Sequence, residues 1–283
     1  MTERRFNGWR REPKDARDHR LAVPPRIELP EEFSLMEYSS PNQNQYSTSS
    51  CVGNAVVNAM ELLHIKLKGK EHHDDLSRLF VYWNARDYIK ETNRDAGCFI
   101  RDAIKGVARY GVCYEKTWGF DAKKVCIEPP AVAYREAELM QILSYYRIGS
   151  TDRAYQVRYA ISQGYPVIFG MDVYESFDQA AKTGVVPVPN PKTEVLQGGH
   201  AMCFEAFSND RQRPGKKRYT CENSWGRNHG DSGFLHIPEE VVDDPSLSDD
   251  YWVIQIVEDP AIPVNKPAIC AYLKYWSRRI FVR

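Results

Sequence analysis

Four residues that could together perform acyl-transfer chemistry stand in a fixed order along this chain: Gln45, Cys51, His200 and Asn223. A cysteine attacks a carbonyl only as a thiolate, and a free thiol is mostly protonated at neutral pH, so it needs a neighbouring base. An imidazole can be that base, one amide can orient the ring, and a second can donate to the oxyanion that forms. This set of residues therefore predicts a cysteine nucleophile with its supporting groups.

Cys51 opens a stretch whose apolar residues recur at three- and four-residue steps, the period of a helix with one buried stripe. The apolar positions are Val52, Ala55, Val56, Ala59, Met60, Leu62, Leu63 and Leu67. Ser49 or Ser50 can cap this helix, which places Cys51 in its first turn. Because a helix N-terminus carries partial positive charge, we expect it to favour the thiolate.

The character of the sequence changes near its middle. Three further helices are expected, at Leu76–Lys90, Ile100–Tyr110 and Thr151–Gln163. After Pro166, short β-rich runs bounded by turn residues predict strands at Val167–Val173, Ala201–Phe207, Arg218–Glu222, Phe234–Ile237 and Tyr251–Val257. A mostly helical first half and a mostly strand second half predict an α+β fold.

Composition and charge exclude several classes of protein. The 283 residues carry 38 basic and 38 acidic side chains, so no overall field would attract nucleic acid or an anionic membrane. No stretch approaches the ~20 apolar residues that span a bilayer, and the first residues lack the apolar core of a secretory signal. We expect a soluble protein that is not exported through a signal peptide, located in a microbial cytoplasm or carried in a virus or phage particle.

The cysteine and histidine content gives no sign of a metal site. The seven cysteines are an odd number in a chain too large to depend on disulfides, and no pair has the two-residue spacing of a zinc knuckle. The run His72-His73-Asp74-Asp75 could hold a metal, but such a cluster is more often a solvated loop. We therefore expect no metal and no cofactor.

Three sequence blocks resemble the signature blocks of papain-like cysteine peptidases. They are Gln45-Tyr46-Ser47-Thr48-Ser49-Ser50-Cys51-Val52-Gly53-Asn54-Ala55, Gly199-His200-Ala201, and Asn223-Ser224-Trp225-Gly226 with Gly230-Asp231-Ser232-Gly233-Phe234. The segment from Gly97 to Ala103 is similar to the part of microbial members that lines the substrate cleft, and the resemblance covers roughly residues 7–258. It implies a two-lobe α+β fold, with a helical N-terminal lobe, a β-rich C-terminal lobe built on a barrel-like antiparallel sheet, and the active cleft between them.

The resemblance also implies a role for each residue. Cys51 and His200 would face each other as thiolate and imidazolium, and Asn223 would orient the ring. Gln45 would donate to the oxyanion, together with the backbone N–H of Cys51. Trp225 would shield the hydrogen bond between histidine and asparagine and contribute to substrate binding. The remaining substrate-binding positions would be Gly97, Gly170, Gly198 and Gly199. The implied activity is that of an endopeptidase, which hydrolyses peptide bonds in a peptide or protein substrate through a thioester.

Several positions depart from the family pattern. Tyr46 and Ser49 stand where the family usually has glycine, and Thr48 stands where exported relatives have a disulfide cysteine. His229 occupies a position where a second tryptophan is usual. These changes affect the loops around the site and remove no catalytic group.

Each assignment has an alternative. Cys51 could be an inert buried thiol and His200 a core histidine. Gln43 could replace Gln45 as the oxyanion donor, and Asn223 also lies in a glycosylation pattern. The protein could perform another thiol acyl transfer, such as deconjugation or transamidation, or it could be an inactive papain-like module that only binds. The presence of Cys51, His200 and Asn223 together favours chemistry over a binding scaffold.

We divide the chain into a lead-in at residues 1–40 that packs on the body, a catalytic domain at 41–258 and a C-terminal extension at 259–283. Secreted relatives carry a much longer pro-segment that inhibits the enzyme. The lead-in is too short to form a separate cleft-covering domain, so we expect control to lie elsewhere, in location or assembly. Aromatic and arginine residues in the extension indicate a docking segment for a partner or for the protein's own body.

Overall fold

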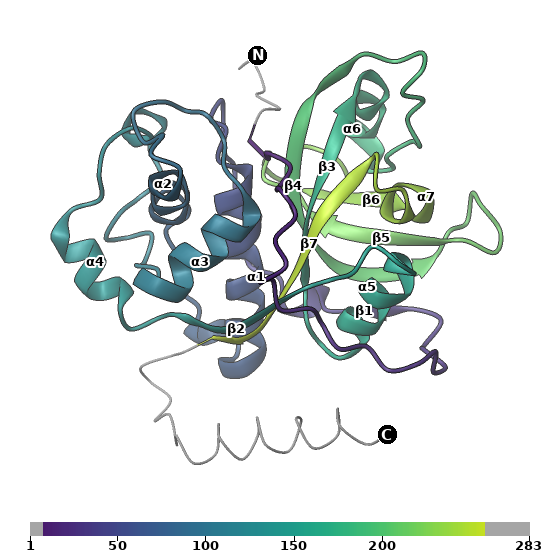
Figure 1. Cartoon of the computed structure of the whole chain (residues 1–283), viewed down its shortest axis with the longest axis horizontal. Helices are drawn as coiled ribbons and strands as arrows, with labels where there is room; N and C mark the ends of the chain where they lie inside the picture. The colour runs from purple at the N-terminus through teal and green to yellow at the C-terminus, as the bar shows by residue number, and fades with distance from the viewer. Residues whose placement is uncertain (1–7, 258–283) are drawn as a thin grey trace.

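The computed structural model describes residues 8–257, which form a helical half and a half built on an antiparallel sheet (Figure 1). The helices are α1 (Cys51–Lys68), α2 (Arg78–Tyr88), α3 (Ile100–Tyr110), α4 (Ala131–Ala137), α5 (Arg153–Ser162), α6 (Ala180–Thr183) and α7 (Glu239–Asp243). The strands are β1 (Phe33–Ser34), β2 (Ile142–Arg147), β3 (Val167–Tyr174), β4 (Leu196–Asn209), β5 (Lys217–Glu222), β6 (Phe234–Pro238) and β7 (Ser248–Val257). The predicted α+β fold is confirmed.

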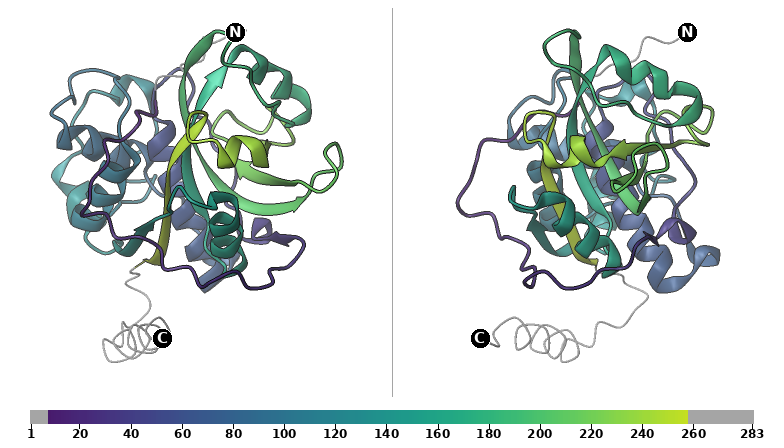
Figure 2. Two further views of the ribbon diagram at one scale, coloured as in Figure 1. Left: turned by 45° about the vertical axis from the view of Figure 1, so that its right-hand side comes forward. Right: turned by 90° about the vertical axis from the view of Figure 1, so that its right-hand side faces the viewer.

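Helix α1 lies between the other helices and the sheet, and for that reason it is buried on nearly all sides (Figures 1 and 2). It begins at Cys51, as the apolar period predicted. The predicted serine cap is wrong: the Ser50 hydroxyl bonds the hydroxyl of Thr48 and accepts from the side chain of Asn54, so it does not cap the helix. The start of α1 is fixed by packing and by this side-chain network.

The sheet has the strand order β2-β7-β3-β4-β5-β6, with β1 paired to β4. All of these pairings are antiparallel. His200 lies on β4 opposite Met171 of β3. Strand β5 pairs with the other side of β4 and ends at Glu222, so the next residue, Asn223, emerges from the sheet beside His200.

Each face of the sheet packs a separate core, because successive side chains along a strand point to opposite faces. Ile168 and Cys203 belong to the core that contains α1, α2 and α3. Their neighbours Phe169 and Phe204 belong to the opposite core, where their rings stack at 3.8 Å between centroids. Helix α1 is thereby fixed on the sheet, and the position of Cys51 relative to β4 is fixed with it.

A segment that we call the strap (residues 8–21) runs in extended form across the junction of the two halves (Figures 1 and 2). The Arg10 N–H donates to Cys98 O at 3.1 Å in the helical half. The Leu21 N–H donates to Arg147 O at 2.9 Å on β2. The strap therefore contacts both halves. The proposed extension at 259–283 lies outside the described residues.

The boundaries of most elements differ from the prediction by a few residues. Helix α3 has the predicted limits, whereas α2 begins at Arg78 because Ser77 caps it by accepting from the Phe80 N–H. The sequence reasoning missed β1, β2, α4, α6 and α7. Among residues 8–257, none of the helices combines the length and the apolar character that crossing a bilayer would require.

Candidate active site

The fold brings the sulfur of Cys51 against the strand that carries His200. Cys51 is the first residue of α1, and the N–H of Ala201 donates to its Sγ at 3.4 Å. Both Cys51 and His200 are completely buried. The predicted nucleophile and base therefore come from the two halves of the molecule, and the sulfur lies against the backbone of the residue that follows His200.

Asn223 holds the His200 ring in one tautomer. The Nε2 atom of His200 lies 2.8 Å from Asn223 Oδ1, which also accepts from the Ser224 N–H at 2.8 Å. Since Oδ1 is the acceptor, Nε2 carries the ring proton and Nδ1 is left with a free lone pair. Within residues 8–257, Nδ1 is buried and has no hydrogen-bond partner. It is the ring nitrogen that can accept a proton from a thiol.

The Trp225 ring covers this hydrogen bond. It lies 4.7 Å from the His200 ring between centroids, tilted by 31°, and is itself largely buried. The ring therefore lies between this hydrogen bond and the solvent.

His229 is a site residue that the sequence reasoning recorded only as a departure from the family pattern. Its Nδ1 lies 3.2 Å from the Asn223 Nδ2 group, and its ring meets Trp225 edge to face at 4.7 Å. Because Asn223 Nδ2 is a donor, His229 Nδ1 accepts. The signal that could have identified His229 is a ring with a polar acceptor at a position where the resemblance implied an apolar one.

Gln45 lies beside the triad and is fully buried. Its Oε1 accepts from the Ser224 hydroxyl at 2.5 Å, and its Nε2 donates to Thr48 O at 2.7 Å. An amide nitrogen has a second hydrogen, which remains available for an oxyanion. The side chain of the alternative residue, Gln43, is instead engaged in a hydrogen bond with Asp75.

Burial makes the thiol and the imidazole neutral in this conformation. Loss of solvent raises the pKa of Cys51 to about 12, although the Ala201 N–H opposes the shift. Burial likewise lowers the pKa of His200 to about 4, and the bond to Asn223 only partly offsets this effect. Desolvation penalises both charged forms, so the expected ion pair is not the favoured state while the sulfur is covered.

The strap is what covers the sulfur. A Cβ atom added to Gly8 would collide with Cys51 Sγ and with Ser49 O, so the Gly8 backbone lies directly on the nucleophile. The carbonyl of Gly8 accepts from the Cys98 N–H at 3.0 Å. Residue 8 therefore covers the sulfur and is held there by a backbone hydrogen bond to the helical half.

The next residue of the strap, Trp9, is only 4% exposed. Its N–H donates to Gly199 O at 3.3 Å. A Cβ atom at Gly170 or Gly199 would collide with the Trp9 ring, so two of the predicted pocket residues form the walls around it. We call this surrounding, formed by Gly170, Gly199 and Asp250, the Trp9 pocket.

Gly97 and Gly198 are the other two predicted pocket residues. Gly97 has a positive φ of 69° and donates its N–H to Tyr82 Oη at 2.9 Å, next to Cys98, which pairs with the strap. Gly198 also has a positive φ, 146°, and pairs with Val173 in the sheet.

The expectation that control lies elsewhere than in the lead-in is not supported. It assumed that a folded domain is needed to cover the site. The described lead-in covers it with one extended segment, because Gly8 permits close approach to the sulfur and Trp9 anchors the chain beside it. A few residues are enough to block the site, because they need to cover only the sulfur and to fill one side-chain pocket.

A second cluster of polar groups lies away from the triad. Ligand-type atoms of Glu61, His73 and Asp75 lie within 4.8 Å of one another. His73 Nε2 is 3.0 Å from Asp75 Oδ1 and 4.0 Å from Glu61 Oε2, and the hydrogen bond to Asp75 raises the pKa of His73. The hydrogen bond between His73 and Asp75 is the short polar contact of this cluster.

Comparison with known proteins identifies the family. The model of the papain family cysteine proteases matches residues 29–251. An uncharacterized peptidase C1-like protein, L477, of Acanthamoeba polyphaga mimivirus is 35% identical over 227 residues, which cover 77% of this chain and 71% of the relative. The crystal structure of xylellain, a cysteine protease from Xylella fastidiosa, superposes with a TM-score of 0.77 at 28% identity, covering 90% of this chain and 98% of xylellain.

A more distant structure agrees in fold. Bromelain from Ananas comosus, in complex with the E64 inhibitor, has a TM-score of 0.59 at 20% identity and covers 81% of this chain and 100% of its own. The family match extends over most of the described residues and includes Cys51, His200 and Asn223. The chain belongs to the papain family of cysteine proteases.

Proposed function

We propose that this protein is a cysteine endopeptidase that hydrolyses peptide bonds with Cys51, His200 and Asn223, and that Gln45 supplies an oxyanion donor. The observation that carries the proposal is the combined geometry of the buried sulfur against β4 and the His200 ring held by Asn223, with its Nδ1 free. An inert buried thiol would not require a tautomer-fixed imidazole beside it.

The reaction follows from these atoms. His200 Nδ1 takes the proton of the Cys51 thiol, and the thiolate attacks the peptide carbonyl. The oxyanion of the tetrahedral intermediate accepts one hydrogen bond from the second N–H of the Gln45 side-chain amide and one from the backbone N–H of Cys51. Collapse breaks the C–N bond, and His200 returns the proton to the leaving amine. Water then attacks the thioester with the same histidine as base, which releases the acid and restores the thiol.

The conformation described here would be latent, because Gly8 covers the sulfur and burial keeps both partners neutral. Displacing the strap would expose Cys51 and His200 to water, and the free-energy cost of forming the thiolate and the imidazolium would fall. The helix N-terminus and the neighbouring imidazolium would then both stabilise the thiolate. Activity would therefore depend on release of the strap.

The proposal is tested by labelling with the peptidyl epoxide E64, the inhibitor bound in the bromelain structure. In a Gly8→Ala variant, in which the strap cannot lie on the sulfur, we expect one adduct on Cys51 at neutral pH. The label should be lost in Gly8→Ala combined with His200→Ala, because no base remains to generate the thiolate. Peptide mapping by mass spectrometry provides the measurement.

Exposed Cys126 is the internal control for nonspecific alkylation. Equal modification of Cys51 and Cys126, unaffected by His200→Ala, would contradict the peptidase proposal and favour a binding module. A labelled enzyme that cleaves no peptide library but processes a conjugated protein would favour the other acyl-transfer reactions.

The latency proposal predicts a change in the pH dependence of thiol alkylation. In the parent chain the pKa of Cys51 is raised to about 12, so its iodoacetamide reactivity should be low at neutral pH and rise only as the pH approaches that value. Gly8→Ala should move the midpoint toward or below the ordinary thiol pKa of about 8.5 and raise the neutral-pH rate at least about tenfold.

Gly106→Ala is the matched control, because a Cβ atom there meets Asn84 Cβ at an ordinary 3.5 Å and leaves the strap untouched. Identical alkylation profiles for the parent and Gly8→Ala chains would show that the strap does not restrain the nucleophile.

His229 is proposed as a positioning residue that keeps the Asn223 amide oriented toward His200. In the Gly8→Ala background, His229→Leu should lower kcat by about ten- to a hundredfold with little change in KM, a loss smaller than the full contribution of a general base. His229→Gln retains an acceptor and should keep most of the activity. A role in packing alone would instead give similar losses in the two variants.

A further inference from the structure

We infer that the Trp9 pocket is a substrate side-chain pocket and that Asp250 makes it selective for a neutral aromatic side chain bearing an N–H donor, that is, tryptophan. This inference rests on the proposed peptidase function and names a residue that sets its specificity. Trp9 occupies the pocket as a ligand that the chain itself supplies, so its contacts indicate which chemical groups the pocket recognises.

The position of Trp9 places the pocket next to the reacting sulfur. The preceding residue, Gly8, lies directly on Cys51 Sγ, and the Trp9 N–H donates to Gly199 O, one residue before His200. The strap forms a parallel bridge with Cys98 on the other side. An extended peptide that reaches the sulfur by this route places a side chain into the same space.

The walls of the pocket select for a flat ring. Neither Gly170 nor Gly199 could carry a Cβ atom without striking the Trp9 ring, and Trp9 is almost fully enclosed. Two glycines that leave room for a planar bicycle indicate that the pocket accepts a large aromatic group and gives little support to a small side chain.

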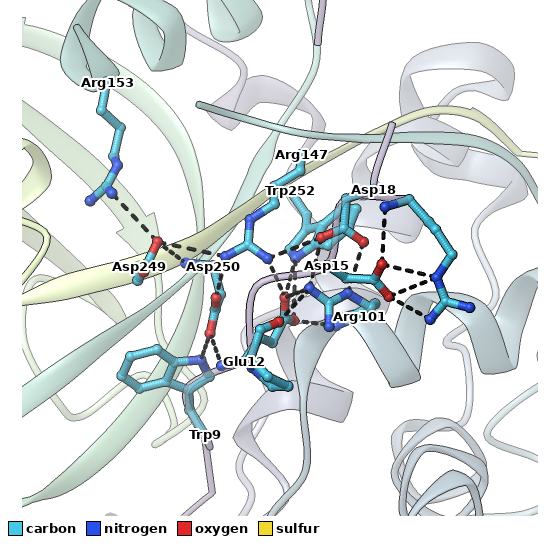
Figure 3. Close-up of polar contacts among 12 residues, drawn as sticks. Trp9, Glu12, Asp15, Asp18, Arg101, Arg147, Arg153, Asp249, Asp250 and Trp252 are labelled. Carbon is cyan, nitrogen blue, oxygen red and sulfur yellow. Dashed lines mark hydrogen bonds and ion pairs between the residues drawn. The ribbon is translucent and has the colours of Figure 1, made fainter. Parts of the chain in front are cut away.

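The floor of the pocket is the carboxylate of Asp250. Its Oδ2 accepts from the indole Nε1 of Trp9 at 3.1 Å, and its Oδ1 accepts from Arg147 Nη2 at 2.6 Å (Figure 3). Asp250 is fully buried and has a positive φ of 57°, an uncommon conformation for a residue other than glycine. One oxygen is therefore fixed by Arg147 while the other points at the ring.

Release of the strap would leave that second oxygen without donors. Besides the indole, Oδ2 accepts from the Glu12 N–H at 2.8 Å, and Glu12 belongs to the strap. Burial raises the pKa of Asp250 to about 6, so the group remains a carboxylate at neutral pH. A buried acceptor that loses its partner strongly favours a ligand that replaces the hydrogen bond over an analogue that cannot.

The surrounding charges decide between a neutral donor and a basic one. Arg101 and Arg147 both pair with Glu12 and Asp18 of the strap (Figure 3). When the strap leaves, these two arginines lose both acidic partners, while Asp249 and Asp250 remain near Arg147. Arg11 leaves Asp249 together with the strap, but Arg147 remains paired with Asp250. A lysine or arginine side chain would place a second cation beside Arg147, so the pocket favours the neutral indole N–H over a charged group.

The test uses the full chain carrying both Gly8→Ala, which removes the strap from the sulfur, and Trp9→Ala, which vacates the pocket. Every variant compared below is made in the Gly8→Ala background. Fluorogenic peptides carry tryptophan or 3-benzothienylalanine, placed in turn at the first and the second position before the cleaved amide. The benzothienyl ring has the shape of indole with sulfur in place of the N–H. At the position that contacts the pocket, kcat/KM should be at least about tenfold higher for tryptophan. An arginine peptide should be poorer than either.

Asp250→Asn is the matched variant, because asparagine tolerates a positive φ and has the same size. Arg147 would hold the amide oxygen, so the NH₂ group would face the indole donor. In Trp9→Ala with Asp250→Asn, the preference for tryptophan over benzothienylalanine should disappear or reverse. Equal use of the two rings by Trp9→Ala, or an unchanged preference after Asp250→Asn, would overturn the inference.

A binding assay separates failure of the inference from failure of the proposed function. The Cys51→Ala, Trp9→Ala chain cannot perform the chemistry, and its affinity for the same two peptides is measured by isothermal titration calorimetry. Tighter binding of the tryptophan peptide, lost with Asp250→Asn, would support the pocket even if no cleavage were found. Cleavage without any difference between the rings would leave the peptidase standing and remove the role of Asp250.

Discussion

The packing of α1 on β4 is the constraint on which the rest of the site depends. It places the first residue of a helix from one half against the backbone of Ala201 from the other, next to the histidine in the chain. The apolar stripe of α1 and the side chains of Ile168 and Cys203 hold this contact from within one core. These core residues take no part in the chemistry themselves, yet they influence the reaction because they set the distance between α1 and β4.

The same junction determines whether the pair can work. With Gly8 on the sulfur, desolvation favours a neutral thiol and a neutral imidazole, although the hydrogen bond from His200 to Asn223 is already in place. The His200 ring is thus already oriented by Asn223 while the thiol and the imidazole are still uncharged. In this account the strap controls solvent access, and the body of the protein supplies geometry in both states.

A polar cluster formed by Glu12, Arg101, Arg147 and Trp252, which we call the clasp, holds the strap. Cys51, by contrast, is buried in an apolar core. Glu12 is enclosed by Arg101, Arg147 and the Trp252 N–H (Figure 3). Burial raises the pKa of Glu12, and the two arginines oppose this shift. Buried ion pairs add little net stability but demand well-defined partners. The clasp is accordingly better suited to fixing the register of the strap, with Gly8 at the sulfur and Trp9 in its pocket, than to holding it tightly.

Much of this could be predicted from the sequence, and the limits have physical causes. The apolar period from Val52 onward identifies α1, and the block around His200 and Asn223 identifies the triad types, because local patterns encode local elements. The capping of α1, by contrast, is decided by Thr48 and Asn54, whose side chains compete for the Ser50 hydroxyl. The contacts of Gly8 with Cys51 and of Trp9 with Asp250 join distant segments, and a single sequence carries no signal for such pairings.

The most direct test of the central claim is acid-quench mass spectrometry of the thioester formed in a strap-released chain. When Gly8→Ala is mixed with a rapidly acylating peptide ester and quenched within milliseconds to seconds, intact-mass and peptide analysis should find one acyl group, on the sulfur of Cys51. The adduct should be absent when His200 is replaced by alanine. An acyl group on another residue, or none in a chain that still hydrolyses the ester, would contradict the account.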